Sequence, residues 1–93
     1  MNDEKLTWII DHLTTCLAAI QVERRHDFDL KAQTFKINAP AGMLFLKVSD
    51  AFLSDNRLAD IAAKFRRWNV AGFLLTNPEH KVLITELGPQ ILE

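Results

Sequence analysis

Carboxylates at Glu23, Asp27 and Asp29 and an ammonium at Lys47 are the groups in this chain best suited to chemistry. With Glu23 closing a first helix, Asp27 or Asp29 on the following strand and Lys47 on a later strand, such carboxylates can hold Mg²⁺ while the lysine stabilises charge on a phosphate under attack. The residue two positions before the lysine, which would be the middle acid of such a site, is Phe45. A principal metal ligand is therefore missing. We interpret Asp27 and Asp29 as the solvated side of an alternating strand, and Lys47 as a strand charge near an edge.

The other residues of catalytic types form no chemical pattern. His12, His26 and His80 lack the spacing of metal ligands. The glycines are not grouped into a phosphate-binding loop, and no serine or threonine has a partner pattern for nucleophilic catalysis. We therefore predict no catalytic residue, no cofactor and no metal site, and we expect a protein that is not an enzyme.

Lys64, Arg66 and Arg67, next to Trp68, form the densest group of cations. Together with Lys47 they are candidate phosphate contacts, and Trp68 would stack on a base. Cations are also expected at a helix C-terminus because they interact favourably with its partial negative charge. The order of elements also resembles that of nucleases with an Asp…Glu-x-Lys metal site, although Phe45 stands in place of the middle acid. A nucleic-acid-binding protein, or a degenerate nuclease-like fold, is therefore the alternative function and not the leading one.

Length and composition define the size and charge of the protein. The 93 residues, 48% hydrophobic and 25% charged, predict a single small α+β domain, 1–93, and exclude a disordered tail. A net charge of −1 gives no overall field to gather nucleic acid or anionic lipid. No apolar run reaches the roughly 20 residues that span a membrane. A charged N-terminus and a lone cysteine, Cys16, which we expect to be buried, indicate a cytoplasmic protein without disulfides.

The first half of the chain changes its hydrophobic period. Helical spacing over residues 3–23 predicts a helix whose apolar face includes Ile20. Alternation then predicts a strand, but its phase slips within residues 27–37. This segment is either one bulged strand or two short strands with a turn near 32–34. After a turn that contains proline and glycine, residues 43–49 are predicted to form the next strand.

The second half begins with an amphipathic helix that ends near Asn69, with a cap among residues 54–56. Its apolar face is made by Leu58, Ile61, Ala62, Phe65 and Trp68. Residues 72–76 and 81–85 are predicted to be strands of a hairpin, because residues 77–80 have the composition of a turn. Only a short tail is expected after this hairpin.

These elements predict an α+β fold in which two helices pack on an antiparallel sheet of about five strands, in the order α-β-β-(β)-α-β-β. Apolar side chains are expected on both faces of the sheet, since Met43 and Phe45 lie on one strand and Phe73 and Leu75 on another. Two helices cover one face, so the other face or an open edge needs cover. A second copy of the chain would supply it, whereas a monomer would need helices on both faces.

Residues 58–69, LADIAAKFRRWN, with GFLL at 72–75 and VLITEL at 82–87, carry a resemblance to a known family. They resemble the second helix and last hairpin of the small dimeric chaperones of type III secretion systems, and the order of elements is similar. This chain has no counterpart of that family's third helix and is less acidic. The resemblance implies a homodimer that binds an extended segment of a partner on apolar sheet surface. It brings no catalytic residues.

We therefore expect a small non-enzymatic module, a homodimer, that binds a partner protein through apolar sheet surface. The expected interface residues are Met43, Phe45, Phe73 and Leu75. No membrane partner is expected.

Overall fold

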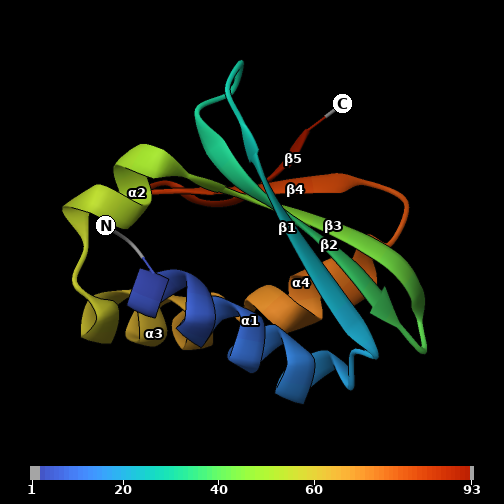
Figure 1. Ribbon diagram of the computed structural model, residues 1–93. Coiled ribbons are helices and arrows are strands. Elements are labelled where there is room, and N and C mark those ends of the chain that lie inside the picture. Colours follow the sequence, from blue (N-terminus) through green and yellow to red (C-terminus); the bar gives the residue numbers. More distant parts are fainter. Residues whose placement is uncertain (1–2, 93) are drawn as a thin grey trace.

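The computed structural model describes residues 3–92 as one sheet with several helices (Figure 1). In chain order the elements are α1 (Asp3–Leu17), β1 (Gln21–Asp27), β2 (Ala32–Ala39), β3 (Gly42–Ser49), α2 (Asp50–Asp55), α3 (Leu58–Arg67), α4 (Val70–Thr76), β4 (Lys81–Thr85) and β5 (Gly88–Leu92). The α+β class and the sheet of five strands are confirmed. The described residues form four helices, however, where two were predicted.

The strands lie side by side in sequence order, β1-β2-β3-β4-β5. All neighbours are antiparallel except β3 and β4, which run parallel. A parallel pair needs a crossover connection, because the chain must return to the starting end of the sheet. Helices α2, α3 and α4 make that connection, so the wholly antiparallel sheet that the sequence suggested is wrong at this one pair.

One face of the sheet is covered by helices. Figure 1 shows α1, α3 and α4 together below the sheet, with no helix over the opposite face. The fully buried side chains come from both layers, and the largest are Ile9, Leu13, Phe35, Ile37, Leu44, Leu46, Phe52, Leu53, Ile61, Phe65, Leu74 and Ile84. The core therefore lies between the lower face of the sheet and the helices, with Phe52 and Leu53 contributed by α2. The upper face has no cover from the described residues.

The first helix ends six residues earlier than predicted. Ala18 has a φ of 51°, a left-handed conformation that an α-helix cannot continue. Residues from Gln21 onward form β1 instead, and Ile20 is 77% exposed, not part of an apolar helix face. Cys16 is exposed as well, which contradicts its predicted burial.

Of the two alternatives for residues 27–37, two strands with a turn is the one found, but the turn lies earlier in the sequence than expected. The turn covers residues 28–31 instead of 32–34, and Lys31 takes the left-handed conformation there, with a φ of 51°. Phe28 and Leu30 lie in this turn and are exposed, so their alternation is not a buried strand face. The predicted strand at 43–49 is confirmed as β3.

The amphipathic helix after β3 is confirmed in its apolar face but not in its cap. Ile61 and Phe65 of α3 are fully buried. The predicted capping segment, 54–56, instead ends a separate short helix, α2, whose own N-cap is Ser49. Arg57 precedes α3 and makes no side-chain cap hydrogen bond. Asn56 is used inside the protein, where its Nδ2 donates to the carbonyl of Phe52 at 2.9 Å.

The predicted strand at 72–76 is wrong, because Val70–Thr76 is helix α4. Asn69 takes the left-handed conformation, with φ 49° and ψ 56°, and its side chain accepts a hydrogen bond from the Gly72 amide at 3.3 Å. This residue turns the chain and begins a new helix. A short apolar run fits a strand or a buried helix equally well, so periodicity alone misassigned it. The hairpin partner of β4 is β5, formed by the supposed tail.

None of the described helices has both the length and the apolar character to cross a membrane.

Candidate binding surface

The uncovered face of the sheet is built from alternate residues of every strand. Residues directly opposite each other on paired strands project from the same face. The strand register therefore places one row across the whole sheet: Glu23, Lys36, Phe45, Lys81 and Leu92. The next row on the same face, two residues away along each strand, is Arg25, Thr34, Lys47, Leu83 and Gln90. We call the face that carries these rows the open face.

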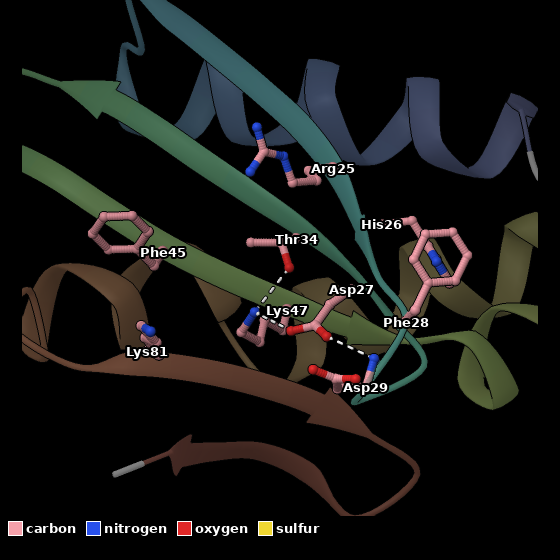
Figure 2. Close-up of a pocket in the computed structure, with 9 residues that line it drawn as sticks. All are labelled: Arg25, His26, Asp27, Phe28, Asp29, Thr34, Phe45, Lys47 and Lys81. Atoms are coloured by element: carbon pink, nitrogen blue, oxygen red, sulfur yellow. Dashed lines mark hydrogen bonds and ion pairs between the residues drawn. The ribbon is translucent and has the colours of Figure 1, made fainter.

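Phe45 lies at the centre of the open face, with a lysine on each side. Its direct neighbours across the strands are Lys36 on β2 and Lys81 on β4. Neighbouring strands are roughly 4.8 Å apart, so the backbones of the two lysines are about 10 Å apart with the ring between them. Phe45 is partly buried, and both lysines are exposed. Arg25 lies on the same face one row away (Figure 2).

The exposed cations around Phe45 are not neutralised by nearby acids. Within the described part of the chain, neither lysine nor Arg25 forms an ion pair. Glu23 is the cross-strand neighbour of Lys36, but the two make no such contact. These cations are therefore available to a negatively charged partner.

Phe45 separates two shallow hollows in the open face, each of about 560 Å³. Arg25, Thr34 and Phe45 line both hollows, and Figure 2 shows the residues around the first. The linings of the two hollows together contain five cationic side chains and three carboxylates. The surroundings of Phe45 are thus positively charged, although the whole chain has a net charge of −1.

Lys47 lies beside Phe45 along β3 but is committed to internal bonds. Its residue is only 8% exposed, and its Nζ donates to Asp27 Oδ2 at 3.0 Å and to Thr34 Oγ1 at 2.9 Å. Figure 2 shows this lysine held between the two acceptors. A nearly buried ammonium needs such partners, because leaving it unpaired would be strongly unfavourable. Lys47 is therefore part of the floor of the open face and offers no free charge, and it is not the edge charge that the sequence suggested.

Asp27 has a second structural task at the end of β1. Its Oδ1 accepts hydrogen bonds from the backbone amides of Asp29, at 3.0 Å, and Leu30, at 3.1 Å. The Leu30 amide, followed by the Lys47 ammonium, lowers the pKa of the Asp27 carboxyl. The carboxylate therefore fixes both the turn after β1 and the position of Lys47.

The residues of the hypothetical magnesium site are only partly brought together. Asp27 and Lys47 meet, but they neutralise each other as an ion pair. Glu23 lies on β1, not at the end of a helix, and Asp29 lies in the following turn. In residues 3–92, no three acidic, histidine or cysteine side chains gather as metal ligands would.

The basic group at Lys64, Arg66 and Arg67 does not join Lys47. It lies on α3, under the covered face, and its members have separate roles (Figure 1). Lys64 Nζ donates to Asn56 Oδ1 at 2.7 Å and to Glu86 Oε2 at 2.9 Å. The Lys64 hydrogen bond, with one from Asn56, lowers the pKa of Glu86.

Two neighbours of Lys64 also contact aromatic rings. The Arg66 guanidinium lies over the Trp8 ring, 5.9 Å from its centroid, and Trp68 packs against Phe52 with a centroid separation of 5.9 Å. Trp68 is therefore part of the packing between helices. Of the three cations, Arg67 alone makes no ion pair, side-chain hydrogen bond or aromatic contact with the described residues.

The three histidines are far apart and have local roles. His12 stacks on Trp8 at 4.6 Å, and burial, with the nearby Arg66 charge, lowers its pKa. His26 Nε2 lies 2.7 Å from Asp50 Oδ2, which joins β1 to α2. His80 is exposed in the turn before β4.

Two of the four predicted interface residues lie on the sheet. Met43 and Phe45 project from the open face. Phe73 and Leu75 belong to α4, on the other side, so their predicted place on sheet surface is wrong. Phe73 packs partly against the core and Leu75 is 45% exposed. The apolar part of the open face is therefore smaller than the sequence suggested.

Three residues that define the charge of the open face were missed: Arg25, Lys36 and Lys81. The alternation of side chains along a strand could have placed two of them on the open face, because the neighbours of Arg25 and Lys36 in the sequence project from the covered face. Extending the predicted helix to residue 23, into what is β1, concealed it for Arg25. The position of Lys81 beside Phe45 depends on a parallel pairing that no local pattern specifies.

The chain matches no protein-family model, no curated protein and no solved structure.

Proposed function

We propose that this chain is a small, non-enzymatic protein-binding module that holds its partner on the open face, centred on Phe45. The observation that carries the proposal is an aromatic side chain at the middle of an uncovered sheet face, ringed by exposed cations. Aromatic residues surrounded by charged and polar groups are typical of the centre of a protein interface. The proposal that the module is not an enzyme is supported by the ion pair between Lys47 and Asp27, because each group neutralises the other and is not free to act on a substrate.

A face, and not an edge, is the proposed binding surface because both edge strands are poorly suited to pairing. β1 carries consecutive charged side chains at Glu23, Arg24 and Arg25, and these discourage another strand from adding to it. β5 has five residues and includes Pro89, which lacks a backbone N–H. A partner that adds a strand would therefore find weak templates on either side.

A second copy of the chain is one candidate occupant of the open face, in a homodimer that covers Met43 and Phe45. The resemblance to type III secretion chaperones implies a dimer that binds an extended segment, but of the residues that carry it, 72–75 belong to α4 and not to a hairpin. Met43 is 41% exposed and Phe45 is partly buried, so covering them would remove apolar area from water.

Nucleic-acid binding is the second candidate function, and it is favoured by the cations that flank an aromatic ring. Single strands bind to proteins by stacking bases on rings while cations hold the phosphates. Its site would be Phe45 with Lys36 and Lys81, and not the predicted combination of Lys47 with the basic group on α3, because these lie on opposite sides of the sheet.

Photo-crosslinking in cells tests the proposal. The photoreactive amino acid benzoylphenylalanine replaces Phe45 in one variant and Arg67, exposed on α3, in a control variant. We expect ultraviolet light to join position 45, and not position 67, to a protein that mass spectrometry then identifies. A second copy of the chain would establish the homodimer, and another protein would establish a hetero-complex. Equal adducts at both positions, adducts to nucleic acid alone, or none would contradict the proposal.

A further inference from the structure

We infer that the open face takes an extended, acidic segment of a partner protein, in which carboxylates at alternate positions flank an apolar side chain. This inference rests on the proposed function and names the chemistry of its partner. The apolar side chain would pack on Phe45, and the two carboxylates would reach Lys36 and Lys81.

The spacing of the row supports this segment. The backbones of Lys36 and Lys81 are about 10 Å apart, with Phe45 midway between them. In an extended chain, residues on one side repeat about every 6.6 Å, so two acids that flank an apolar residue are about 13 Å apart. Long, flexible lysine side chains can accommodate the remaining 3 Å or so. An acid, any residue, an apolar residue, any residue and an acid therefore fit the row.

The charge of the face favours a partner that is acidic. In the first hollow Lys47 and Asp27 neutralise each other, and Arg25, which lines both hollows, adds a further exposed cation beside Phe45. A second copy, the other candidate occupant, would bring the same positive surroundings of Phe45 against itself, so the charge of the face disfavours it. An acidic segment of another protein meets no such repulsion.

The carboxylates of the open face favour a peptide over a nucleic acid. Glu23 and Asp29 lie in the linings of the two hollows, where they would repel a continuous phosphate backbone. A peptide, in contrast, can carry acidic side chains at just the positions that face the lysines and neutral side chains elsewhere. Stacking of successive bases needs several rings, whereas Phe45 is the one aromatic side chain in the described rows of the face, and Phe28, which also lines the first hollow, lies in the turn after β1.

Fluorescence anisotropy with labelled synthetic peptides tests the inference. The probe is Gly-Ser-Glu-Ser-Phe-Ser-Glu-Ser-Gly, and its matched controls replace both glutamates by glutamine or by lysine. A labelled oligothymidylate reports nucleic-acid binding. We expect the acidic peptide to bind most tightly and to lose affinity as salt is raised from low concentration to about 150 mM, because exposed charges are screened.

Charge-reversal variants locate the site. Lys36→Glu and Lys81→Glu should each weaken binding of the acidic peptide about fivefold to tenfold, from the loss of one exposed ion pair and the gain of one repulsion. Arg67→Glu makes the same change in net charge on α3 and should leave the affinity within about twofold. Because all three side chains are exposed, these variants are expected to fold.

Equal binding of the glutamine peptide, equal weakening by Arg67→Glu, or tighter binding of the oligothymidylate would each overturn the inference. So would the absence of binding by every peptide. The crosslink at position 45 tests the proposed function separately. A protein adduct at this position together with no preference for the acidic peptide would support the open face as a binding surface, but would show that its partner is not acidic.

Discussion

Replacing Lys47 by methionine should leave the stability of the protein almost unchanged, although it removes an ion pair. The ammonium loses two charge-assisted hydrogen bonds, one to Asp27 and one to Thr34. In exchange, a group whose side chain is 10% exposed no longer has to be desolvated, a penalty of several kcal/mol. We therefore expect the free energy of unfolding of Lys47→Met to be within about 1 kcal/mol of the parent.

The aspartate does not become stranded in this variant. Its side chain is 27% exposed, and it keeps its hydrogen bonds from the amides of Asp29 and Leu30. Methionine also keeps the length of the lysine stem, which packs in the floor of the open face.

Alanine at the same position supplies the matched comparison. It removes three methylenes of a nearly buried stem at about 0.8 kcal/mol each, so Lys47→Ala should be about 2–3 kcal/mol less stable than Lys47→Met. Urea unfolding followed by the fluorescence of Trp8 and Trp68 measures both variants. If the two variants were equally destabilised by more than about 2 kcal/mol, the ion pair itself and not the stem would hold the sheet, and the reasoning would be refuted.

Three further predictions concern the rest of the fold. Asn69→Ala should destabilise the protein by about 1–2 kcal/mol in urea unfolding, because it loses both the cap of α4 and a residue that tolerates the left-handed conformation, whereas Asn69→Gly should cost only a few tenths; equal losses would exclude this explanation. The pKa values of Asp27 and Glu86 are lowered, so their stabilisation is fully present above the unfolded-state pKa of about 4 and is lost as the pH falls through the lower folded values. Urea titrations should therefore show stability falling below about pH 4, less steeply in Glu86→Gln; an unchanged slope would contradict the assignment to Glu86. Cys16 is exposed and should react fully with Ellman's reagent in the folded protein, and reaction only after addition of denaturant would show that it is buried.

The strongly periodic elements were predictable from sequence. β3 and the apolar face of α3 follow from alternation and from helical spacing sustained over several residues, and burial enforces both patterns. The α+β class followed from the same elements. The C-terminal end of α1 and the turn after β1 were not predictable, since Ala18 and Lys31 adopt left-handed conformations without being glycine or asparagine.

Helix α4 shows why a short apolar run misleads. Phe73 to Leu75 reads as a strand because consecutive apolar residues suit a buried sheet equally well. The decision is made at Asn69, whose side chain caps the first turn, and by Val70, Ala71 and Leu74, which meet the core at helical spacing. Misassigning this helix also transferred Phe73 and Leu75 to a sheet they do not join.

The candidate surface was half predictable for a related reason. Met43 and Phe45 could be placed because β3 was placed. The cations around Phe45 come from β1, β2 and β4, and they become neighbours only through the register and the parallel pairing of β3 with β4. Such long-range pairing is a property of the whole fold.

A titration of the isotope-labelled protein with the acidic peptide, followed by amide nuclear magnetic resonance shifts, tests the central claim most directly. We expect shifts confined to β2, β3 and β4 near Lys36, Phe45 and Lys81, with the amides of α1 and α3 unchanged. Shifts centred on the helical side of the sheet, or spread evenly over the chain, would show that the open face is not where this protein binds.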